Sequence, residues 1–133
     1  MSIFTYETLH FTVSPPQIRL LDLVSGPGPI TCHLRHAPLS QNQNYEALSY
    51  CWGPPSAKKY TIYINAKPFP VTPNLRSALQ RLRPRTLWVD AICINQSDDQ
   101  EKNQQVPLMR AIYESAERVQ IWLGEEDKYT MLA

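Results

Sequence analysis

The chain has 133 residues, 43% of them hydrophobic, which is enough for one compact domain and too few for two well-formed cores. Its 13 Lys and Arg residues nearly balance its 12 Asp and Glu residues, so charge gives no support to nucleic acid or an anionic membrane as a partner. No apolar run approaches the roughly 20 residues of a membrane span, and MSIFTYETLH at the N-terminus lacks the apolar stretch of a signal peptide.

Cysteine usage favours a reducing compartment. Cys32, Cys51 and Cys93 stand far apart and form no Cys-x-x-Cys pair, so we expect free thiols and a cytoplasmic protein. Cys32 is close to His33 and His36, but no second ligand pair has zinc-like spacing. We therefore predict no metal site.

The first predicted element is a β-hairpin near the N-terminus. IRLLDLV (18–24) and ITCHLRHAPL (30–39) are β-like segments, and the SGPGP between them can turn but cannot continue a ladder. A third strand is predicted in YEALSYCWG (45–53), which ends where Gly-Pro-Pro forces a turn.

A second hairpin and a helix follow. YTIYIN (60–65) alternates as a half-buried strand does, and NAKP leads into the short return FPV. Thr72 and Pro73 suit the N-cap and first position of a helix over 73–83, whose apolar residues recur at i, i+3, i+4 and i+7.

The last third of the chain predicts a strand, a helix and a strand. Residues 86–94 form an apolar run suited to a strand buried on both faces, and 118–123 suit a final strand. Between them we expect a turn over 98–102 and a helix over 105–117, because Pro107 inside a helix costs about 3 kcal/mol or more. This order predicts an α/β fold with a mostly parallel central sheet flanked by helices, to which the N-terminal hairpin is added.

Polar residues at the predicted strand ends form the candidate site, because the ligand crevice of an open parallel sheet lies outside the carboxyl ends of its strands. The expected ligand-binding residues are Ser49, Tyr50, Trp52, Gly53, Asn95 and Gln96.

Asp90 and Glu101 are the candidate catalytic residues. A lone Asp in an apolar strand is costly unless it is hydrogen-bonded, and a carboxylate near a strand end is a common functional feature. Hydrogen bonds that fix the register of the strand explain Asp90 equally well. Glu101 lies three residues after Asp98, which is the spacing of a capping box and favours a structural role.

The order of several motifs resembles the fungal heterokaryon incompatibility (HET) domain. The motifs are YEALSYCWG, PNLRSALQRLR, LWVDAICINQ, Glu101, QV and M..IY..A..V.IWLG, which together cover 45–124. Residues 1–44 correspond to a variable lead-in, so 1–133 would form a single HET-like domain. In two departures, Pro54 stands where the family often has an acidic residue, and the chain ends soon after WLGEED, where family members usually continue.

The resemblance implies self/non-self recognition between fungal cells that ends in programmed cell death. The family is also regarded as a distant relative of Toll/interleukin-1 receptor (TIR) domains, some of which self-assemble and hydrolyse NAD. The resemblance thus implies a TIR-like or flavodoxin-like sheet.

Two functions remain open. In one, the domain signals cell death by binding protein partners, chiefly further copies of itself. In the other, it is a hydrolase that takes NAD as substrate and uses a strand-end carboxylate to stabilise an oxocarbenium-like state. The residues do not decide between them, because both carboxylates have structural explanations and motifs that activate a nucleophile are absent.

Overall fold

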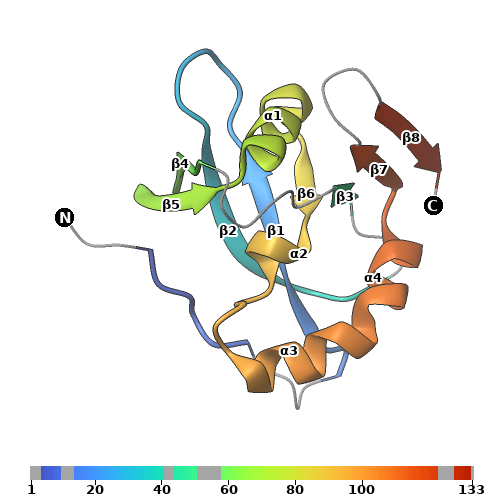
Figure 1. Ribbon diagram of the computed structural model, residues 1–133. Coiled ribbons are helices and arrows are strands. Elements are labelled where there is room, and N and C mark those ends of the chain that lie inside the picture. Colours follow the sequence, from blue (N-terminus) through green and yellow to red (C-terminus); the bar gives the residue numbers. More distant parts are fainter. Residues whose placement is uncertain (1–3, 10–13, 41–43, 51–57, 123–127, 133) are drawn as a thin grey trace.

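Eight strands of the described residues form one mixed sheet in the computed structural model, in the order β5-β4-β2-β1-β6-β3-β7-β8 (Figure 1). The structure describes residues 4–9, 14–40, 44–50, 58–122 and 128–132. The strands are β1 (Gln17–Leu23), β2 (Thr31–Pro38), β3 (Glu46–Tyr50), β4 (Tyr60–Ile64), β5 (Lys67–Val71), β6 (Thr86–Trp88), β7 (Arg118–Trp122) and β8 (Lys128–Leu132). The helical elements are α1 (Pro73–Leu82), α2 (Asp90–Cys93), α3 (Asp99–Gln105), the 3-10 turn η1 (Val106–Leu108) and α4 (Met109–Ser115).

The α/β class is confirmed, but the prediction of a mostly parallel sheet is wrong. β6, β3 and β7 do run parallel, with Ala47 opposite both Trp88 and Val119. Antiparallel pairings nevertheless outnumber parallel ones in the described sheet, because β1–β2, β1–β6, β4–β5 and β7–β8 are all antiparallel. The hairpins are thus part of the sheet, and their directions give no support to a flavodoxin-like or TIR-like arrangement.

The N-terminal hairpin is confirmed, and it lies in the middle of the sheet. β1 pairs with β2 in continuous register on one side and with β6 on the other, where Leu21 lies opposite Leu87. Both leucines are fully buried. Residues 17–38 therefore contribute directly to the core that supports the rest of the fold.

The second hairpin, β4–β5, is also confirmed. Asn65 (φ 50°) and Ala66 (φ 67°) at its tip both adopt the left-handed conformation. Two left-handed residues match the twist of the strands in a two-residue hairpin turn. The Asn65 side chain accepts a hydrogen bond from the Leu34 amide at 3.1 Å, which ties the tip to β2.

The helix predicted at 73–83 is confirmed as α1. The Thr72 hydroxyl accepts the N–H of Leu75 at 3.2 Å, so Thr72 is the N-cap and Pro73 the first helical residue. The predicted apolar face is buried. α1 and α2 lie over the same face of the sheet, in front of β1 and β6 in Figure 1.

The strand predicted at 86–94 is wrong beyond Trp88. β6 is only three residues long, Val89 is extended, and the chain then forms the helical turn α2. Ile92, Cys93 and Ile94 are all buried, so the run is apolar because it crosses the core and not because it is a strand. A short apolar run has the same composition in either conformation.

The single helix predicted at 105–117 is confirmed only in part. Residues 98–102 form the N-cap and first turn of α3, and the helical conformation continues through η1 into α4, which ends at Ser115. Pro107 separates the two helices within η1, near the start of a new turn, where its missing N–H costs no hydrogen bond. None of the helices in the described ranges is long and apolar enough to cross a membrane.

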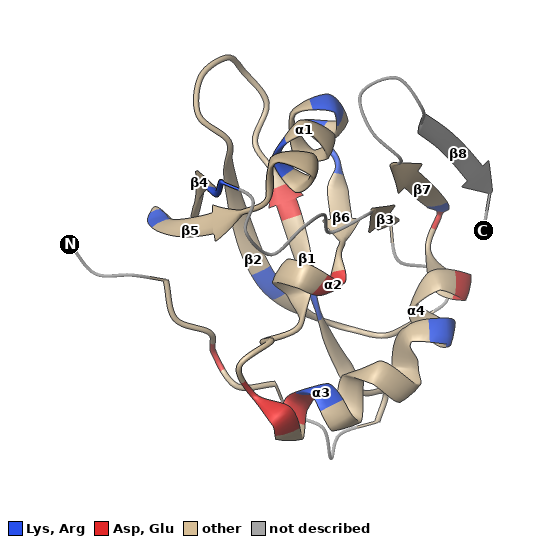
Figure 2. Cartoon of the chain, in the orientation of Figure 1, with Lys and Arg blue, Asp and Glu red and all other residues tan. Residues whose placement is uncertain are grey.

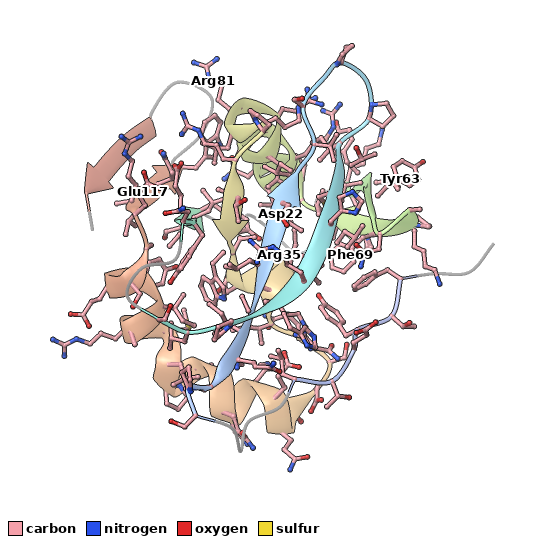
Figure 3. The ribbon with its side chains drawn as sticks, turned by 180° about the vertical axis from the view of Figure 1, so that it is seen from behind. Asp22, Arg35, Tyr63, Phe69, Arg81 and Glu117 are labelled. Carbon is pink, nitrogen blue, oxygen red and sulfur yellow. The ribbon has the colours of Figure 1, made fainter. Side chains whose placement is uncertain are left out.

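A charged network lies on the sheet face opposite α1, where Figure 3 shows Asp22 beside Arg35. Arg35 Nε donates to Asp22 at 2.7 Å, and the Thr86 hydroxyl donates to the same carboxylate at 2.7 Å. Burial raises the pKa of Asp22, but these two hydrogen bonds outweigh it and hold the pKa below its ordinary value. Because both side chains of the ion pair are about 34% to 48% exposed, it contributes little to stability.

Replacing Ala66 by Gly should stabilise the protein. A left-handed conformation costs an L-residue about 1–2 kcal/mol in the folded state. Gly avoids this strain but lowers stability by about 0.4–1 kcal/mol, because it gives the unfolded chain more conformational freedom. We expect the free energy of unfolding to rise by roughly 0.5–1 kcal/mol in urea titrations. Ala78→Gly in the buried face of α1 is the control and should lower it by at least about 1 kcal/mol. A destabilised Ala66→Gly would contradict the left-handed turn.

Candidate functional site

Two neighbouring parallel strands, β3 and β6, have their carboxyl ends on the same side of the sheet. β3 ends at Tyr50 and β6 at Trp88, which lies opposite Ala47 in β3. Beyond β6, Asp90 occupies the first position of α2. A carboxylate is favourable at the start of a helical turn, where backbone N–H groups are unpaired. Asp90 therefore lies just beyond the end of β6 and not inside a strand. Its side chain is half-buried there.

The negative charge of Asp90 acts on two tyrosines, Tyr50 of β3 and Tyr113 of α4. Burial is the main reason that the pKa of each phenol lies above its ordinary value, and the charge of Asp90 raises both further. Hydrogen bonds of Tyr50 with Thr72 and of Tyr113 with Ser49 oppose this effect without cancelling it. Both phenols are therefore protonated at neutral pH and able to donate a hydrogen bond.

A cavity of about 160 Å³ adjoins this cluster between β5 and α1. Tyr50, Thr72 and Gln96 bring polar groups to its wall, and Lys59 brings a positive charge. The remaining wall is apolar and comes mainly from β5, α1 and α2. Of the residues expected at the two strand ends, Tyr50 and Gln96 line this cavity, whereas Asp90 and Asn95 are not among its lining residues.

Gln96 connects this pocket to the turn that follows α2. Its Nε2 donates to the backbone oxygen of Asp90 at 2.8 Å and to that of Ile94 at 3.4 Å. These bonds hold the chain close to α2 after the helical turn ends. Gln96 therefore fixes the loop that forms this side of the cavity.

Glu101 lies in a different environment, a buried ion pair with Arg19. Arg19 Nη1 and Nη2 donate to the two carboxylate oxygens at 2.6 and 2.8 Å, and the side chains are only 1% and 2% exposed. The backbone N–H of Asn95 donates to the same carboxylate at 2.6 Å. Such a two-pronged pair fixes geometry as well as charge. We call Arg19, Glu101 and the Asn95 amide the clamp.

The clamp also holds the N-terminal segment. Arg19 donates to the backbone oxygens of Cys93 at 3.1 Å and of Glu7 at 2.8 Å. Its guanidinium lies 4.7 Å from the centroid of the Tyr6 ring, and the Tyr6 hydroxyl donates to the Ile92 oxygen at 2.7 Å. The first residues, β1, α2 and α3 are therefore joined at one buried point.

The capping prediction for this region is confirmed in part. Asp98 is the N-cap of α3, and its carboxylate accepts the N–H of Glu101 at 3.1 Å. The Glu101 carboxylate reaches back to the amide of Asn95 and not to that of Asp98, because Arg19 holds it toward the core. Both of its oxygens are occupied, which favours the structural reading of Glu101 over the catalytic one.

Sequence reasoning missed Arg19 as a key residue. The available signal was an Arg inside the apolar run IRLLDLV, where a charge is costly unless it is paired. Its partner, Glu101, is 82 residues away in sequence, and no local pattern links the two.

The remaining predicted site residues fall into three groups. Ser49 bonds to Tyr113 and belongs to the Asp90 cluster. The Asn95 side chain accepts the N–H of Ser97 at 3.1 Å and its amide serves the clamp, so Asn95 is not among the residues that line the cavity. Trp52 and Gly53 lie outside the described residues.

The two thiols in the part of the chain that the structure describes are inert in this setting. Cys32 and Cys93 are free and buried, and burial raises the pKa of each to about 12. A thiol with so high a pKa is a poor nucleophile at neutral pH. Within the part of the chain that the structure describes, no group of three His, Cys, Asp or Glu side chains is arranged to hold a metal ion.

Arg19→Leu should cost about 3–5 kcal/mol in the free energy of unfolding, because it leaves the Glu101 carboxylate buried and unpaired. Replacing both residues by Leu should recover part of this loss. The control is Arg35→Leu, which breaks the exposed pair with Asp22 and should cost at most about 1 kcal/mol.

Urea unfolding followed by circular dichroism measures all three variants. If Arg19→Leu is too unstable to fold, the double variant must fold for the account to hold. Equal losses in Arg19→Leu and Arg35→Leu would show that the clamp has no special role.

Comparison with known proteins identifies the family. Residues 45–133 match the family described as "Heterokaryon incompatibility protein (HET)". The protein "Heterokaryon incompatibility protein 6, OR allele" of Neurospora crassa is 36% identical over 143 aligned residues, which cover 92% of this chain and 21% of that protein. The chain therefore spans about a fifth of the length of this relative. No solved structure matches the chain. The family match and the relative together show that the chain belongs to the heterokaryon incompatibility (HET) family.

Proposed function

We propose that the chain is a signalling domain of fungal heterokaryon incompatibility that induces cell death through self-association in the cytoplasm. The observation that carries the proposal is the 36% identity, over 92% of the chain, to a Neurospora crassa protein named for heterokaryon incompatibility. Because the chain spans only 21% of that protein, the proposed role is that of one module within a larger incompatibility protein.

The clamp suits a recognition module. It holds the N-terminal segment and the loops around α2 in one fixed arrangement through charge-assisted hydrogen bonds. A surface built on such a frame binds without first being ordered, which lowers the cost of association. In this role the polar residues at the strand ends stabilise the surface and perform no chemistry.

The two edges of the sheet differ as places for a second copy to pair. β5 forms one edge and contains Pro68 and Pro70, which lack the N–H that a strand needs to continue a ladder. β8 forms the other edge. Under the proposal, two copies therefore associate through β8 and not through β5.

Hydrolysis of NAD is the second candidate function, and one observation favours it. Asp90 is half-buried just before Ala91, which lines the cavity, and its charge acts on two protonated phenols. A carboxylate in this position would stabilise the oxocarbenium-like state in which the nicotinamide bond breaks. Glu101 is bound by Arg19 and the Asn95 amide, so under this alternative Asp90 carries the reaction.

Expression of the chain and of its Asp90→Asn variant in fungal cells tests the proposal. We expect both to reduce viability to a similar degree, because a signalling role needs the fold and not the charge of Asp90. Ser97→Ala, at an exposed position of the same loop, is the matched control. Loss of killing by a normally folded Asp90→Asn protein would overturn the proposal in favour of catalysis.

Two measurements on the purified chain complete the test. Light scattering over a range of concentrations should show oligomers, and a strictly monomeric chain would contradict self-association. Incubation with NAD should release no nicotinamide above the rate without protein. Release that disappears in Asp90→Asn would establish the second candidate.

A further inference from the structure

The cavity beside Tyr50 has the size and lining of a site for one small apolar group. Its volume is about 160 Å³, and Phe69, Val71 and Leu75 contribute apolar wall. An apolar cavity of about 150 Å³ is enough to hold a benzene ring. The described wall therefore fits a single aromatic ring or a branched aliphatic group.

Positive charge gathers at the rim of this cavity. Lys59 lines it, and Tyr60 lies opposite Val71, one of its wall residues. Two further cations pack on the Tyr60 ring, with the Arg76 guanidinium 4.6 Å and the Lys58 ammonium 5.6 Å from its centroid. Figure 2 shows basic segments on α1, near β4 and at the start of β5, whereas acidic segments gather at the start of α3.

Another part of the cavity wall is polar but neutral. Tyr50 and Gln96 contribute to it, and the charge of Asp90 acts on Tyr50. An anion would be repelled by Asp90 near Tyr50 and attracted by Lys59, which lines the cavity, and by Lys58 and Arg76, which are next in sequence to the lining residues Lys59 and Leu75. The charge distribution therefore orients a ligand, with its neutral part inside and its negative part at the rim.

We propose that this cavity binds a small ligand in which an aromatic or branched apolar group carries a phosphate or carboxylate. The apolar group occupies the space between β5 and α1, and the anionic group pairs with Lys59 and Arg76. Binding of this kind is a property of the folded chain and does not depend on its proposed role in cell death.

Chemical-shift titration of the purified chain with phenyl phosphate and with benzoate tests the proposal. Both should shift the amides of Tyr50, Thr72 and Gln96 in a saturable way. Benzyl alcohol, which has the ring without the charge, and inorganic phosphate, which has the charge without the ring, should each bind about tenfold more weakly. The stronger of phenyl phosphate and benzoate identifies the anionic group.

Matched variants separate the two halves of the site. Lys59→Gln and Arg76→Gln should each weaken phenyl phosphate about three- to tenfold and leave benzyl alcohol unchanged. Arg110→Gln on α4, whose side chain is 89% exposed, is the control and should change neither. Ala91→Leu should fill the cavity and abolish binding of both compounds, whereas Ala111→Leu, at an exposed position of α4, should not.

Either of two results would overturn the proposal. One is the absence of saturable shifts near Tyr50 with phenyl phosphate and benzoate. The other is inorganic phosphate that binds as tightly as phenyl phosphate, which would reduce the site to a surface cluster of cations. Both results are independent of whether the chain kills cells.

Discussion

The buried ion pair between Arg19 and Glu101 is the interaction on which this structure depends most. It joins residues 82 positions apart, and its guanidinium also binds the backbone of the N-terminal segment and of α2. A buried charge of this kind is stable only while every partner stays in place, since removal of one leaves the other desolvated and unpaired. The fold is therefore continuous from the first described residues to α3. β1 therefore belongs to the same folded unit as the part that matches the HET family, because the arginine comes from β1 and the glutamate from α3.

α2 lies between two polar clusters, one around Glu101 and one around Asp90, and the two carboxylates differ in how deeply they are buried. Toward the N-terminal segment, Glu101 has both oxygens hydrogen-bonded and is only 2% exposed, so it is closed to a ligand. At the end of the sheet, Asp90 is half-buried beside two tyrosines and adjoins a cavity through Tyr50. The two carboxylates look alike in sequence, yet Glu101 is buried in an ion pair whereas Asp90 is half-buried at the first position of α2. The clamp binds the Asn95 amide, and the next residue, Gln96, lines the cavity, so the two environments are linked through this loop.

The parts of the fold that depend on neighbouring residues could be predicted from the sequence. Both hairpins and the cap of α1 follow from turn residues and from Thr72 with Pro73, whose effects act within a few positions. The direction of the strands was not predictable in this way, because it depends on which edges meet in three dimensions. The apolar run at 86–94 led to the wrong prediction of a strand beyond Trp88, because burial in a helical turn selects the same residues as burial in a strand. In the site, Tyr50 follows from the end of β3, whereas Gln96 reaches the cavity from the loop after α2 and the pairing of Arg19 with Glu101 depends on contacts distant in sequence.

Native-state hydrogen exchange at the Asn95 amide tests the central claim most directly. This N–H donates to Glu101, so it becomes free to exchange only when the clamp opens. If the clamp holds the fold together, the amide opens with the same free energy as the buried amides of β1, because both require global unfolding. Exchange of Asn95 at the rate of an ordinary surface loop, while β1 remains protected, would show that the clamp opens locally and that the fold does not depend on it.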